Sequence, residues 1–257
     1  MKILAVGDLV GKIGFEKMKQ ELPKIIKEND IDFIIVNGEN VAEGMGITEK
    51  LYRAILLAGV NVITMGNHTW GKKEIFNFID EKNIIRPANY SKGNPGKGYE
   101  IYKCKNKKIA VINLIGRVSM SVLSDNPFEA AKKIIDDIKS KVDIIVIDFH
   151  SEATAEKIAL GYYLKGDATI IFGTHTHVHT ADEQIFPNGT AYITDIGMTG
   201  PKDSVIGMDV NASIKRFETT LPEKYKLAEG ECILNGVIFD IDDAKNRVTD
   251  IKRIFIK

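Results

Sequence analysis

The stretch Gly173-Thr174-His175-Thr176-His177-Val178-His179-Thr180 holds three of the five histidines in the chain. It follows a short apolar run, residues 168–172, that is typical of a buried strand. Residues two apart in an extended chain point the same way and lie about 6–7 Å apart, which would let two imidazoles reach into one pocket. The stretch therefore predicts a metal site at the end of a strand, against the alternative of a histidine-rich surface loop.

The composition is that of an ordinary globular protein. Of 257 residues, 44% are hydrophobic and 27% are charged, and 35 basic residues balance 35 acidic ones. A net charge of zero gives no strong general attraction to nucleic acid or to an anionic membrane. The two cysteines form no Cys-x-x-Cys motif, and no apolar run is long enough to span a membrane. We expect a cytoplasmic protein that folds as one domain over residues 1–257.

Strands and helices alternate through the first third of the chain. Buried strands are predicted for residues 2–6, 32–36 and 60–64. Helices are predicted for residues 14–28, 48–57 and 72–81, with Pro23 weakening the first of them locally. This alternation favours a mostly parallel sheet covered by helices, with sites at the carboxyl ends of the strands.

The rest of the chain adds helices, one more buried strand and paired strands. Helices are predicted for residues 126–140 and 152–164, and a strand over residues 142–149 delivers His150. Paired strands are expected at residues 98–104 with 108–113, at 181–186 with 190–193, and at 231–241 with 247–256. Residues 195–201 are predicted to form a glycine-rich loop.

Eight side chains able to bind metal follow predicted strands. They are Asp8, Glu39, Asn40, Asn67, His68, His150, His175 and His177. Carboxylates, amides and imidazoles together suit manganese, iron or zinc better than magnesium or calcium, and there are enough of them for two metals that share a bridging carboxylate.

Each residue also has a simpler interpretation when it is taken alone. Asp8 and Glu39 could each cap a helix, Asn67 could be a turn residue, and His150 could be a hydrogen-bonded core histidine. His179 lies beyond the pair His175 and His177, so we expect it behind the ligands or on the surface. Taken together, the strand-end positions favour a shared site for two metals.

Several short motifs carry a resemblance to a known family. In order they are Gly7-Asp8, Gly38-Glu39-Asn40, Gly66-Asn67-His68-Thr69-Trp70, His150, and Gly173-Thr174-His175-Thr176-His177. This order resembles the calcineurin-like metallophosphoesterase superfamily, and in particular its YmdB-like bacterial branch. Leu9-Val10 replaces the usual histidine of the first motif, and Glu39 replaces the usual aspartate of the second, as in that branch. In the third motif, Gly71 stands after Trp70 where an aspartate is expected.

The resemblance implies a fold and a ligand set. The fold would be an α/β protein built as a four-layer α/β/β/α sandwich of the metallophosphoesterase type. Metal one would be held by Asp8, Glu39, Asn40 and His177. Metal two would be held by Glu39, Asn67, His150 and His175, with Glu39 bridging, and His68 would bind no metal. Iron is the metal that the resemblance favours, with manganese and zinc as the others.

The resulting hypothesis is a dimetal phosphodiesterase, a hydrolase that acts on a small phosphodiester. A hydroxide bridging the metals would attack phosphorus, and His68 would protonate the leaving oxygen as general acid. Family resemblance suggests 2′,3′-cyclic nucleotides as substrates. The sequence identifies no substrate-binding residue, since Arg117 could clamp a phosphate or simply be solvated.

Two other classes of protein remain open. A regulatory or interaction protein could retain the dimetal site with little turnover. A metal-dependent amidohydrolase also uses His-x-His, but there the motif lies near the N-terminus, which disfavours it here. The sequence leaves the oligomeric state open, a homo-oligomer included.

Overall fold

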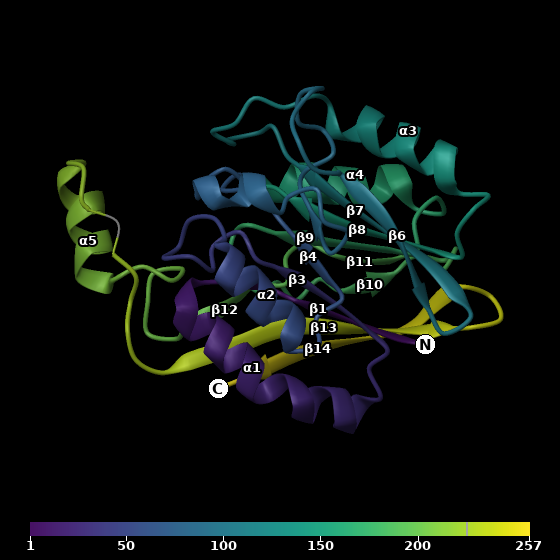
Figure 1. Cartoon of the computed structure of the whole chain (residues 1–257), viewed down its shortest axis with the longest axis horizontal. Coiled ribbons are helices and arrows are strands. Elements are labelled where there is room, and N and C mark those ends of the chain that lie inside the picture. The colour runs from purple at the N-terminus through teal and green to yellow at the C-terminus, as the bar shows by residue number, and fades with distance from the viewer. Residues whose placement is uncertain (225) are drawn as a thin grey trace.

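Two β-sheets lie face to face between two pairs of helices in the computed structural model, which describes residues 1–224 and 226–257 (Figure 1). The helices are α1 (Gly11–Asn29), α2 (Glu49–Leu57), α3 (Pro127–Ile138), α4 (Thr154–Leu164), α5 (Val210–Thr219) and the 3₁₀ helix η1 (Lys73–Asn77). No helix in residues 1–224 and 226–257 is both long enough and apolar enough to cross a membrane.

The first sheet has the strand order β2-β12-β13-β1-β3-β4-β5, and β14 pairs with β13. Its strands are β1 (Lys2–Val6), β2 (Asp8–Leu9), β3 (Phe33–Asn37), β4 (Val62–Thr64), β5 (Ile84–Ile85), β12 (Met198–Pro201), β13 (Cys232–Asp242) and β14 (Arg247–Ile256). Strands β1, β3, β4 and β5 are parallel, whereas β13 runs antiparallel to β1.

The second sheet has the strand order β10-β11-β9-β8-β7-β6. Its strands are β6 (Tyr99–Cys104), β7 (Lys107–Ile115), β8 (Ile144–His150), β9 (Ile170–Thr174), β10 (Gln184–Ile185) and β11 (Ala191–Ile193). The four central strands are parallel, and the two edge strands are antiparallel.

The layers follow from side-chain alternation along the strands. In β1, Ile3 and Ala5 face the second sheet, while Leu4 and Val6 face the other way and pack with residues of α1 and α2. On the far side, α3 and α4 cover the outer face of the second sheet. Both faces of each sheet are therefore buried, which explains why the strands are nearly continuous apolar runs in the sequence. The predicted α/β/β/α sandwich is confirmed.

Some local predictions differ from the structure. The mostly parallel sheet expected from the first third of the chain is present as β1, β3, β4 and β5, but antiparallel strands from the C-terminal part join it. The expected helix over residues 72–81 is only the short η1, because one turn already buries Ile75 and the aromatic ring of Phe78 stacks on Tyr52. Helix α1 continues through Pro23.

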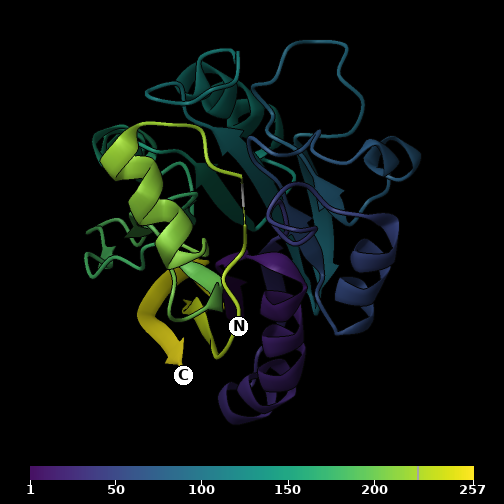
Figure 2. The same ribbon diagram turned by 90° about the vertical axis from the view of Figure 1, so that its left-hand side faces the viewer.

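The C-terminal third holds two elements that the sequence did not reveal. The supposed loop at 195–201 contains β12, which pairs with β2. Helix α5 is capped by the Asp209 side chain, which accepts from the Ala212 amide at 2.9 Å, and it buries only Ser213. It stands apart from the four layers (Figures 1 and 2), so hydrophobic periodicity gives little sign of it.

The contact between the two sheets gives a direct test of the fold. Phe239 on β13 stacks on Phe172 of β9 with 6.4 Å between ring centroids. Phe239→Ala should lower the free energy of unfolding by about 3–5 kcal/mol, because it leaves a cavity between the sheets. Urea unfolding measures the change. Phe255→Ala on β14 is the control, since Phe255 is 56% exposed, and a similar loss in both variants would contradict the sandwich core.

Candidate metal centre

The strand-end residues meet at one edge of the sandwich. Glu39 and Asn40 follow β3, Asn67 follows β4, and His150 ends β8. Parallel strands present their carboxyl ends at the same edge of a sheet, and here two sheets contribute to one site. The carboxyl ends of β1 and β9 lead to Asp8 and His175.

His150 lies between three other predicted ligands. Its Nε2 is 2.9 Å from Asn67 Oδ1, 3.0 Å from Glu39 Oε1 and 3.0 Å from His175 Nδ1. One potential ligand atom from each of Glu39, His150 and His175 lies within 4.8 Å of the others. These four side chains are the set predicted for metal two, and the structure brings them together.

Asp8, Asn40 and His177 lie beside this group with looser contacts. Asp8 Oδ1 is 3.9 Å from His177 Nε2, and Asp8 Oδ2 accepts a hydrogen bond from the His175 amide at 3.3 Å. Asp8 Oδ1 and Asn40 Oδ1 are both buried without a hydrogen-bond partner among the described residues. Buried oxygens without donors are costly, so these two atoms fit a bound cation.

The histidine loop, residues 175–179, is not the extended chain that the sequence predicts. Strand β9 ends at Thr174, and the backbone then turns left-handed, with φ of +98° at His175 and +63° at His177. The two rings therefore have different neighbours: His175 Nδ1 meets His150, whereas His177 Nδ1 donates to the Ile206 carbonyl at 2.8 Å. Positive φ at two non-glycine residues is strained backbone, which concentrates at functional sites.

Electrostatics at the site favour a bound cation. Burial opposes ionisation of Glu39, but His150 outweighs it and lowers the pKa of Glu39 to about 2. Burial also disfavours a charged His150, yet Glu39 and Asp8 raise its pKa to about 9. Burial raises the pKa of Asp8, although His177 and His150 oppose that effect. A metal ion would replace the His150 proton as the positive charge beside these carboxylates.

Gly66 leaves the space that this arrangement needs. A Cβ atom at this position would lie 2.4 Å from His150 Nε2 and 2.5 Å from Glu39 Oε2. Even an alanine would force these two side chains apart.

Comparison with known proteins assigns the family. The model of the YmdB-like protein family matches residues 4–254. The chain belongs to the YmdB-like family. A relative from Bacillus subtilis (strain 168), named 2′,3′-cyclic-nucleotide 2′-phosphodiesterase, is 51% identical over 257 residues, which are 100% of this chain and 97% of the relative. The family lies in the metallophosphoesterase superfamily, so the predicted resemblance is confirmed.

Two solved structures of similar proteins have the same fold. A novel phosphatase from Mycoplasma pneumoniae has a TM-score of 0.95 at 38% identity, covering 100% of this chain and 93% of that one. A protein from Thermus thermophilus has a TM-score of 0.94 at 34% identity, covering 99% and 98%. The predicted enzyme class, hydrolase, is confirmed, because relatives with informative names are phosphodiesterases or phosphatases.

His68, His179 and Arg117 differ in their contacts with the candidate ligands of the YmdB-like site. The His68 amide donates to Glu39 Oε2 at 2.9 Å, and the residue is partly exposed. His179 is half-buried with its Nδ1 3.3 Å from Asn235 Oδ1, and no hydrogen bond or ion pair within residues 1–224 and 226–257 joins it to the candidate ligands. Arg117 is exposed, and its backbone amide donates to Glu156.

A group of polar side chains behind His150 was not predicted from the sequence. The Thr174 hydroxyl donates to Asp148 Oδ1 at 2.7 Å, so it accepts from His150 Nδ1 at 2.9 Å. Thr64 donates to the other oxygen of Asp148. These contacts keep a proton on Nδ1, so Nε2, which faces the site, is the His150 nitrogen that a metal could bind in place of a proton. An aspartate inside an apolar strand, two residues before His150, was the available signal.

A buried ion pair holds the histidine loop. Lys157 Nζ on α4 is 2.6 Å from Asp195 Oδ2, and both side chains are at most 1% exposed. Asp195 also accepts from the Thr176 amide at 3.1 Å and from the Gly197 amide at 2.8 Å. The pair therefore ties the residue between His175 and His177 to helix α4. Nothing in the local sequence around Lys157 predicts this long-range contact.

Removing the Lys157 charge tests this pair. Lys157→Met should lower the free energy of unfolding by about 3–5 kcal/mol, because it leaves Asp195 buried without its cation. We also expect weaker metal retention, since the histidine loop loses its anchor. Urea unfolding and metal content measure the two effects. Lys132→Met is the matched control: it breaks the more exposed Lys132–Asp167 pair and should change the free energy of unfolding far less. Equal costs would rule out an anchoring role.

Proposed function

We propose that the chain is a two-metal phosphodiesterase that hydrolyses 2′,3′-cyclic nucleotides. The observation that carries the proposal is the meeting of Glu39, Asn67, His150 and His175 around one point. The Bacillus subtilis relative, 51% identical along the whole chain, carries that activity in its name. The family and the structure together support a phosphodiester-hydrolysing site at this edge of the sandwich.

The residues divide into two ligand sets. Asp8, Glu39, Asn40 and His177 would hold metal one, and Glu39, Asn67, His150 and His175 would hold metal two. The unpartnered oxygens of Asp8 and Asn40 support the first set. We take iron as the favoured metal, with manganese or zinc as alternatives. The metals would supply Lewis-acid activation of water and charge neutralisation on the phosphoryl oxygens.

The reaction requires one new bond and one broken bond at phosphorus. A water oxygen bonds to phosphorus, the bond from phosphorus to the 2′ oxygen breaks, and a nucleoside 3′-phosphate leaves. The departing 2′ oxygen needs a proton, and we assign its delivery to His68. Its backbone is fixed by Glu39 and its partly exposed side chain is next to the ligand Asn67 in sequence. His68 thus acts as the general acid.

Turnover and metal dependence test the proposal. Purified protein should hydrolyse 2′,3′-cyclic AMP to the 3′-phosphate, and chelation should bring the rate close to the uncatalysed one. Adding iron, manganese or zinc back, one at a time, should restore activity and identify the effective metal. Protein that retains two metals per chain yet turns over neither the cyclic nucleotide nor a simple diester would favour the alternative, a regulatory protein that keeps the site.

The His68 assignment has its own test. His68→Ala should retain both metals and lose about 10²–10⁴-fold in kcat on 2′,3′-cyclic AMP, because an alkoxide leaving group needs a proton. A p-nitrophenyl diester should suffer much less, since its leaving group departs without one. Metal analysis and steady-state kinetics measure both effects, with His179→Ala as the control that keeps activity. Equal losses on the two substrates would refute the general-acid role.

A further inference from the structure

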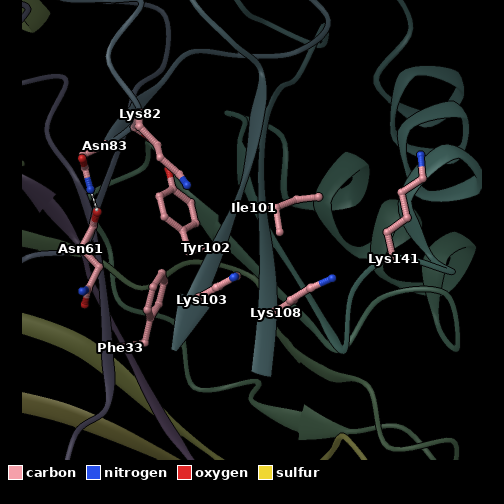
Figure 3. Close-up of a pocket in the computed structure, with 9 residues that line it drawn as sticks. All are labelled: Phe33, Asn61, Lys82, Asn83, Ile101, Tyr102, Lys103, Lys108 and Lys141. Atoms are coloured by element: carbon pink, nitrogen blue, oxygen red, sulfur yellow. Dashed lines mark hydrogen bonds between the residues drawn. The ribbon is translucent and has the colours of Figure 1, made fainter. Parts of the chain in front are cut away.

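A cavity lies at the opposite edge of the sandwich from the metal centre. It has a volume of about 550 Å³ and is formed where the parallel strands begin. Phe33 opens β3, Asn61 precedes β4, and Asn83 precedes β5. Figure 3 shows its lining, to which the β6–β7 hairpin also contributes.

Four lysines and no acidic residue line this cavity among the described residues, namely Lys82, Lys103, Lys108 and Lys141. None of the four forms a salt bridge with a described residue. Three of the nearest acidic groups along the chain have other cations as partners: Glu81 pairs with Arg53, Glu100 with Lys97 and Asp32 with Lys105. The fourth, Asp143, accepts from the Lys108 backbone amide. The lining thus carries four positive charges and no negative one, with Asp143 close by, in a chain whose net charge is zero.

Lys103 and Lys108 lie directly opposite each other on β6 and β7. Side chains at directly paired positions have Cβ atoms about 4.5–5.5 Å apart, and like charges there destabilise the sheet. Figure 3 shows both side chains pointing the same way, toward the side on which Lys141 lies. An anion between the two ammonium groups would turn this repulsion into attraction.

Protection of an exposed strand edge explains these lysines only in part. Edge strands often carry lysine because it discourages pairing with another chain, and β6 is the edge of its sheet. Lys108, however, lies on β7, which is paired on both sides by β6 and β8. A lysine there protects no edge, yet it completes the like-charged pair.

We propose that this cavity is a binding site for a diphosphate-bearing small molecule. Lys103 and Lys108 share one phosphate group, since ammonium groups bind phosphate as compact point charges. Lys141 lies on the same side and supplies further positive charge (Figure 3). Lys82 lies outside this face, because its ammonium is over the ring of Tyr102, which points to the opposite side of β6. The site is separate from the metal centre, because it uses the opposite ends of the same strands.

Equilibrium binding of inorganic pyrophosphate and of adenosine diphosphate to the metal-loaded protein tests the proposal. Lys103→Gln/Lys108→Gln should weaken binding on the order of tenfold, which is a typical effect of removing contacting charges. Lys19→Gln/Lys27→Gln on α1 removes the same charge from exposed positions and should leave binding intact. Tighter binding of the nucleotide would identify a nucleoside diphosphate as the ligand, and equal binding would identify the diphosphate group alone.

Thermal melting and turnover separate a ligand site from a lysine pair that only keeps the strand edge soluble. Without ligand, Lys103→Gln/Lys108→Gln should melt no lower than wild type, because it removes a repulsion, and turnover at the metal centre should be unchanged. Pyrophosphate should raise the melting temperature of wild type more than that of this variant. Unchanged binding in this variant, or an equal loss in both variants, would overturn the proposal. Aggregation of this variant with unchanged binding would assign the lysines to solubility alone.

Discussion

The structure around the site depends on two carboxylates that are buried at one edge of the sandwich. Asp8 and Glu39 are at most 1% exposed, and an ionised carboxylate without compensation is very costly inside a protein. The compensation comes from His150, from the His68 amide and from Gly66, whose missing side chain lets the groups approach. A metal ion completes the same balance, so the requirement for a stable fold and the requirement for a reactive site coincide at these residues.

Contacts from several other parts of the structure hold the histidine loop in place beside these carboxylates. Left-handed backbone at His175 and His177 persists only if surrounding contacts hold it. The Lys157–Asp195 pair holds it from one side, through Thr176, and the Ile206 carbonyl holds the His177 ring from the other. Asp148 orients His150 through Thr174 in the same manner. His150 and His177 thus each have one ring nitrogen engaged and the other turned to the site.

The sequence predicts the residues that gather here because strand-end positions are local features. An apolar run followed by Gly-Asp or Gly-Glu-Asn can be recognised without knowing what lies beside it, and the four-layer fold followed from the order of such motifs. The conformation of the histidine loop, the position of Lys157 and the strand β12 were missed. Each depends on partners far away in sequence, and helix α5 buries too little surface to leave a periodic pattern. Local sequence patterns therefore predict which residues are candidate ligands, whereas long-range contacts determine the orientation of their side chains.

The place of β13 in the first sheet has a consequence for how the protein is made. This strand, residues 232–242, lies between β1 and β12, and β12 in turn pairs with β2, which begins at Asp8. On a ribosome, the first strand is synthesised long before the neighbour that completes its sheet. A nascent chain can form the second sheet with α3 and α4 early, but β1 keeps one open edge until residues 232–242 have emerged. Assembly of the Asp8 side of the site therefore has to wait for β13.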